Sequence, residues 1–167
     1  LGKVLAALIE GDWVTHLATN GAGVIHDWEF AYQGLSSEDV RENVKVGKFG
    51  TWEESGLYIN LALAAGAYQG LGYGESIGSL ICSDGLQIPT EAELMDDILN
   101  RCGEKKLWKR AAAADFLELI QTENLSPGWM NIAHPYSDFS IQAHAYKNKT
   151  PFTSHPMFGH DIIYTHR

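Results

Sequence analysis

Cysteine is scarce in this chain of 167 residues, which contains only Cys82 and Cys102. Two cysteines so far apart provide neither a disulfide framework nor the paired spacing of a zinc site. Disulfides form in oxidising compartments, so a sequence without a disulfide pattern favours a reducing compartment. We therefore expect a cytoplasmic protein.

Long apolar runs are missing as well. No run approaches the roughly 18 residues of a membrane-spanning helix, and residues 1–10 are too short and wrongly flanked for a signal peptide. We expect no membrane partner. The chain starts without a methionine, in what reads as the middle of a helix, and residues 161–167 read as an unfinished element. We expect one domain, residues 1–167, that is incomplete at both ends.

The chain has few positively charged residues. It contains 12 lysines and arginines and 21 aspartates and glutamates, which gives a net charge of −9. A nucleic-acid-binding surface needs clustered lysine and arginine, so we expect no nucleic-acid partner. An acidic field attracts cationic ligands such as polyamines. Many soluble proteins are mildly acidic without such a ligand, and that alternative stays open.

What the sequence does contain is a series of short strands and longer helices. Residues 13–19 alternate as a strand, residues 20–23 form a glycine-rich turn, and residues 24–32 have apolar side chains at helical spacing. We expect a second strand at 150–154, a loop at 126–129, and helices at 3–10, 36–46 with Ser36 as N-cap, 51–71, 75–81, 91–101, 108–121 and 140–146. Strands joined by long helical connections pair in parallel. The predicted fold class is therefore α/β.

Ligands of parallel sheets bind at the carboxyl ends of the strands, which places residues 20–27 and 155–161 at one edge. Glycines let a polar ligand approach the backbone, and the amides at a helix start favour phosphate. Gly21 and Gly23 have the spacing of a dinucleotide-binding turn, but His26 stands where its third glycine would be. The residues alone leave a structural turn and a phosphate-binding turn equally open.

Several segments, in the right order, resemble deoxyhypusine synthases. Residues 14–27 (VTHLATNGAGVIHD) resemble the family's strand, glycine-rich turn and helix, and residues 143–152 (AHAYKNKTPF) resemble its helix ending in Lys-Asn before a buried strand. Residues 161–164 (DIIY) resemble the acidic residue and apolar run that follow in the family, and residues 36–40 (SSEDV) and 49–54 (FGTWEE) resemble its bacterial and archaeal branch. The resemblance covers residues 3–81 and 130–167, and residues 82–129 do not align.

The resemblance implies a Rossmann-like parallel sheet flanked by helices, a homotetramer, and NAD as cofactor. It also implies an enzyme, an NAD-dependent aminobutyl transferase. Such enzymes take the aminobutyl group of spermidine, hold it as an imine on a lysine, and pass it to a lysine of a translation initiation factor. The family's catalytic lysine corresponds to a position beyond residue 167.

Carried over by position, the family's NAD-binding turn falls on Asn20, Gly21 and Ala22, with Gly23 completing the turn. Asp161 matches an acidic residue of the nucleotide or amine site. The resemblance thus predicts a cofactor site made from these five residues.

The residues expected to face the amine substrate are His26, Asp27 and His160. Family enzymes have two adjacent glutamates before the aspartate, where this chain has Ile25 and His26. Isoleucine cannot pair with an amine, and histidine accepts a hydrogen bond only while neutral. This departure supports two alternatives: an enzyme for another polyamine, as in homospermidine formation, and a non-catalytic member of the family.

The C-terminal histidines support a third and weaker hypothesis, a metal-dependent hydrolase. His155, His160 and Asp161 could be ligands, but their spacing matches no standard site, and hydrogen-bonded histidines at a strand end are the simpler interpretation. We therefore expect no metal. Ser76 and Ser83 lack the Gly-x-Ser-x-Gly setting of a serine hydrolase.

Overall fold

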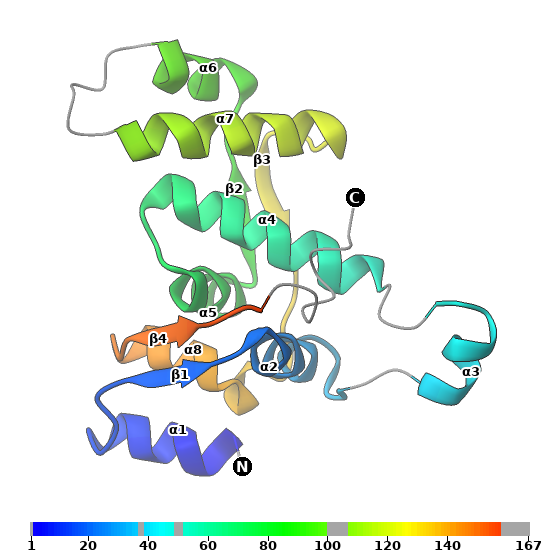
Figure 1. The fold of residues 1–167 in the computed structure, drawn as a ribbon. Coiled ribbons are helices and arrows are strands. Elements are labelled where there is room, and N and C mark those ends of the chain that lie inside the picture. Colours follow the sequence, from blue (N-terminus) through cyan, green and yellow to red (C-terminus); the bar gives the residue numbers. More distant parts are fainter. Residues whose placement is uncertain (1, 37–38, 49–51, 100–106, 158–167) are drawn as a thin grey trace.

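The computed structural model describes residues 2–36, 39–48, 52–99 and 107–157. Short strands are set among helices along the chain (Figure 1). The helices are α1 (Gly2–Glu10), α2 (Gly21–Gln33), α3 (Val40–Lys45), α4 (Glu53–Gln69), α5 (Tyr73–Ser83), α6 (Glu91–Leu99), α7 (Leu107–Thr122), the 3-10 helix η2 (Ser137–Phe139) and α8 (Ile141–Lys147). The strands are β1 (Leu17–Thr19), β2 (Gly85–Ile88), β3 (Gly128–Asn131) and β4 (Phe152–Ser154).

The first and last strands form a parallel pair. In β1 and β4, Leu17 lies opposite Phe152 and Thr19 lies opposite Ser154. Most of the helices lie between these strands in the chain, which is the long connection that parallel pairing requires. The α/β fold class is therefore confirmed in its coarse form, as a helix-rich structure with a small parallel sheet. The Rossmann-like sheet stays a prediction.

The other two strands, β2 and β3, form an antiparallel pair in which Gln87 lies opposite Trp129. The sequence pattern does not predict β2, and the loop predicted at 126–129 is wrong at 128–129, which belong to β3. Both strands have four residues and begin with a glycine at positive φ, at Gly85 and Gly128. Their pairing is set by contacts distant in sequence, which short-range patterns do not carry.

Several predicted boundaries are also corrected. The strand predicted at 13–19 is limited to Leu17–Thr19. Helix α2 begins at Gly21, three residues earlier than predicted. The N-cap of α3 is Asp39, whose carboxylate accepts a hydrogen bond from the backbone N of Glu42 at 3.1 Å, so the prediction of Ser36 as N-cap is wrong.

Helix α5 lies at the centre of the fold and contacts α2, α4, α8 and β4 (Figure 1). Glycines permit these close contacts: a Cβ on Gly78 would lie 2.6 Å from the carbonyl oxygen of Gln142 in α8, and one on Gly66 in α4 would lie 1.9 Å from the hydroxyl of Ser76. Helices α6 and α7 pack together beyond α4. Among the described helices, none is long and apolar enough to cross a membrane.

A histidine is buried in the core beneath α2. His134 is 2 % exposed, and its ring centroid lies 6.1 Å from those of Trp28 and Tyr32. Within the described residues neither ring nitrogen has a hydrogen-bond partner, and the nearest carboxylate oxygen, on Asp84, is 3.7 Å from Nδ1. Burial lowers the pKa of His134 to about 4 although Asp84 opposes the shift. The ring is therefore neutral at pH 7.

Candidate functional site

The carboxyl ends of β1 and β4 lie side by side, as predicted. Asn20 follows β1 and His155 follows β4, and the backbone N of His155 donates to the carbonyl oxygen of Thr19 at 2.8 Å. The expectation that the two segments meet at one sheet edge is confirmed where they leave the strands, at Asn20 and His155. His160 and Asp161, predicted to line the same edge, lie outside the described residues.

The glycine-rich segment is the first turn of α2 and not a separate loop. Asn20 is the N-cap, and its side-chain Oδ1 accepts a hydrogen bond from the backbone N of Gly23 at 2.9 Å. The amides of Gly21 and Ala22 have no intrahelical acceptor, because they belong to the first turn of a helix. Ala22 is exposed whereas Gly21 is buried, so solvent reaches this end of α2 on the Ala22 side.

Packing against the end of β1 explains why residue 23 is a glycine. A Cβ at this position would lie 2.0 Å from the hydroxyl oxygen of Thr19, the last residue of β1. The glycine therefore lets the helix start close against the end of the strand. This packing accounts for Gly23 without a ligand, whereas the free amides of Gly21 and Ala22 are those that an anion would use.

The carboxylate of Asp27, expected to bind substrate, has a different place in the structure. It accepts hydrogen bonds from the hydroxyl of Ser140 at 2.7 Å, from the backbone N of Ile141 at 2.8 Å, and from the backbone N and side chain of Gln142 at 3.1 and 3.0 Å. These donors form the start of α8. Asp27 thus joins α2 to the N-terminus of α8, where an acidic group is stabilising.

His26 is half-exposed on the second turn of α2, in a small polar cluster. Its Nδ1 lies 2.5 Å from the hydroxyl oxygen of Ser36 and 3.4 Å from Oε2 of Glu29. The Ser36 hydroxyl is placed to donate to Glu29 Oε2, at 3.4 Å. In the tautomer with its proton on Nδ1, His26 donates to the Ser36 hydroxyl, which can then donate to Glu29. Neutral His26 then has an unprotonated Nε2, which no group in the described part of the chain hydrogen-bonds.

Ile25, which occupies the position of a family glutamate, is 5 % exposed and belongs to the core. It therefore presents nothing to a ligand at the sheet edge. Of the three adjacent residues Ile25, His26 and Asp27, only His26 has a polar atom that the described protein groups leave without a partner.

Two more histidines meet on the β1–β4 sheet, a contact that the sequence analysis missed. The hydroxyl oxygen of Thr153 lies 3.1 Å from Nε2 of His16 and 2.9 Å from Nε2 of His155. Thr153 and His155 are two residues apart along a strand, so the sequence could predict that they share a face. The position of His16 beside them depends on the pairing of β1 with β4 and could not be predicted locally. No group of three metal-ligating side chains occurs among the described residues.

No protein-family model, curated protein or solved structure matches the chain. The resemblance to deoxyhypusine synthases therefore stays a prediction from the quoted segments. The function has to be argued from the geometry of the sheet edge.

Proposed function

We propose that the chain binds NAD at the carboxyl edge of β1 and β4, as part of an aminobutyl transferase related to deoxyhypusine synthases. The observation that supports this most is the Asn20-capped start of α2 beside the end of a parallel strand pair. A helix start carries partial positive charge, and the amides of Gly21 and Ala22 are suited to the pyrophosphate. The donor set therefore fits a dinucleotide.

The amine would lie beside His26. When bound, NAD supplies a hydride acceptor for the oxidation of an amine. Glu29 and Ser36 hold the imidazole through Nδ1, so that neutral His26 offers the Nε2 lone pair to an N–H of the amine. The prediction of His26 as a substrate-binding residue is kept in this form, with spermidine or another polyamine as substrate.

A second candidate, an altered-substrate or non-catalytic protein, is favoured by the neighbours of His26. Ile25 is in the core, and Asp27 is hydrogen-bonded to α8, so neither supplies a free carboxylate for an ammonium group. An amine held by neutral histidine alone would be bound weakly. Homospermidine-type chemistry fits this alternative. The homotetramer, the cytoplasmic location and the initiation factor as acceptor remain parts of the main proposal.

Calorimetric titration of the chain with NAD tests the cofactor proposal. Ala22→Glu places a carboxylate at the second residue of α2 and should weaken NAD binding about tenfold or more, roughly 1.4 kcal/mol of repulsion. Ala92→Glu is the matched control, because Ala92 is also exposed and is the second residue of α6. Equal NAD affinity in both variants, or no NAD binding by the unmodified chain, contradicts the proposal.

A titration of the NAD-loaded chain with spermidine separates the two candidates. The main proposal predicts heat of binding that is lost in His26→Phe. NAD binding without any response to spermidine would favour the altered-substrate or non-catalytic protein.

A further inference from the structure

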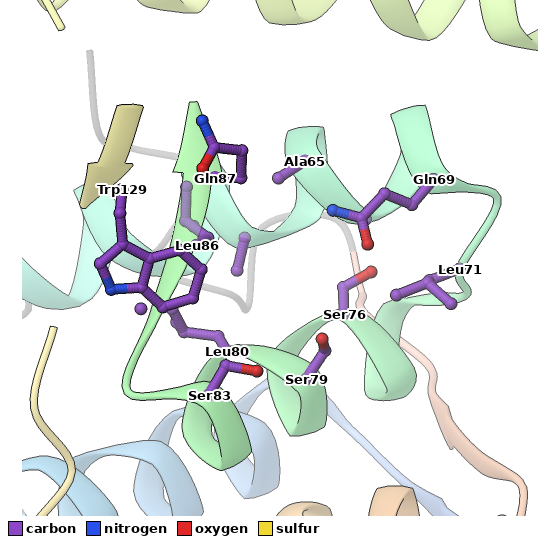
Figure 2. A pocket seen from close by; sticks show the side chains of 13 residues that line it. Ala65, Gln69, Leu71, Ser76, Ser79, Leu80, Ser83, Leu86, Gln87 and Trp129 are labelled. Atoms are coloured by element: carbon purple, nitrogen blue, oxygen red, sulfur yellow. The ribbon is translucent and has the colours of Figure 1, made fainter. Parts of the chain in front are cut away.

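A hollow of about 160 Å³ lies between α4, α5 and the β2–β3 pair (Figure 2). It contains none of the residues of the sheet-edge site. Its volume is the share of about five water molecules in the liquid. Whole ligand pockets are usually larger, about 300 Å³ or more. The hollow therefore has room for one ring system and not for a dinucleotide.

The polar groups around the hollow are all uncharged. Helix α5 presents Ser76, Ser79 and Ser83 along one face, and Gln69 of α4 points toward them (Figure 2). Among the described residues that line the hollow, none is aspartate, glutamate, lysine, arginine or histidine. A ligand that suits these walls is neutral and has both donors and acceptors, because hydroxyl and amide groups serve as either.

Several of these groups have no partner within the protein. Within the described ranges, nothing hydrogen-bonds the side chains of Gln69, Ser79 or Ser83, whereas Ser76 already donates to the carbonyl oxygen of Gly72 at 2.7 Å. The side-chain amide nitrogen of Gln87 donates to the carbonyl oxygen of Ile88 at 3.1 Å. The side-chain oxygen of Gln87 accepts no hydrogen bond from the described residues. These donors and acceptors, from two helices and a strand, line the hollow; Gln69, Ser83 and Gln87 are exposed to solvent and Ser79 is half-buried.

One wall is the indole of Trp129, which lies over a glycine of the neighbouring strand. Trp129 of β3 is 55 % exposed, and its ring lies over Gly85, where a Cβ would be 3.0 Å from the ring. Gly85 has φ of 151°, a conformation that favours glycine, so no side chain displaces the indole. Figure 2 shows the ring beside Leu86 and Gln87 at the border of the hollow. The exposed indole offers a stacking surface for a flat ring.

We infer that this hollow binds a neutral nucleobase of the adenine type, stacked on Trp129. A base has a flat π-face for the indole, and a glutamine side chain can pair with the amino and ring nitrogens of adenine. The uncharged walls match an uncharged ring, and the volume matches one ring system. A plain sugar would offer hydroxyls but no flat aromatic face.

Adenosine and ribose, added separately to the ¹⁵N-labelled chain, test the inference by NMR. The indole N–H signal of Trp129, identified by its loss in Trp129→Phe, should shift with adenosine and not with ribose. Trp129→Ala should weaken adenosine binding about tenfold, whereas Trp13→Ala, at an indole that is 81 % exposed and does not line the hollow, should leave it unchanged.

The unmodified chain gives the decisive result even if Trp129→Ala fails to fold. No shift of the Trp129 signal with adenosine, or an equal shift with ribose, overturns the inference. Adenosine binding should persist in Ala22→Glu, which affects the sheet edge only. The failure of this inference is therefore distinguishable from the failure of the NAD proposal.

Discussion

Lowering the pH should destabilise the fold through His134. In the unfolded chain this histidine has the ordinary pKa of 6.5, whereas in the folded chain burial lowers its pKa to about 4. Between these values the unfolded state binds a proton that the folded state does not. The free energy of unfolding therefore falls as the pH decreases through that window, and the contribution of His134 is unaffected above it.

The size of this loss follows from the two pKa values. Each pH unit inside the window costs about 1.4 kcal/mol, so His134 should contribute a loss of about 2 kcal/mol between pH 7.5 and pH 5. By pH 4 the loss reaches about 3 kcal/mol. That is a large part of the total stability of an ordinary domain, about 5–15 kcal/mol.

Urea unfolding followed by circular dichroism at pH 7.5 and pH 5 measures the effect. His134→Phe keeps an aromatic ring against the stacked pair of Trp28 and Tyr32 and has no group to protonate, so its stability should fall by about 2 kcal/mol less than that of the unmodified chain. His155→Phe removes an exposed histidine and is the matched control. Its change in unfolding free energy between pH 7.5 and pH 5 should equal that of the unmodified chain. The same pH dependence with and without His134 would refute the reasoning.

Two further predictions concern packing and capping, both measured by urea unfolding at pH 7.5. Asp27→Asn removes the charge at the start of α8 and should lower the free energy of unfolding by about 2 kcal/mol. Asp39→Asn, at the exposed start of α3, is the control and should lower it by about a few tenths of a kcal/mol. Equal losses in the two variants would contradict the role given to Asp27. Gly78→Ala brings a Cβ against the carbonyl oxygen of Gln142 and should cost about 1–3 kcal/mol. Gly72→Ala meets only an ordinary contact and should be close to neutral, and a neutral Gly78→Ala would show that α5 and α8 are less closely packed.

Much of the sheet edge could be predicted because its signals are local. The order of strand, glycine-rich turn and helix was predicted within residues 13–32, although the turn is the first turn of α2 with Asn20 as its N-cap. The parallel partner was predicted from the long helical connection, and β4 does lie beside β1. These inferences needed only the spacing of neighbouring residues and the rules of chain connection.

The side-chain contacts could not be predicted in the same way. Asp27 is bonded to residues 113 to 115 positions away in the chain, so its role as a cap for α8 depends on tertiary packing. The same holds for Thr153 between two histidines. The hollow beside Trp129 was missed because its residues come from α4, α5, β2 and β3, and no motif links them.

The central claim, that NAD binds at the start of α2, is tested most directly by mapping NAD onto the backbone amides of the ¹⁵N-labelled chain. The account predicts the largest chemical-shift changes at Gly21 and Ala22, with smaller changes at His26 and His155. Absence of shifts at Gly21 and Ala22, with or without binding elsewhere, would contradict it.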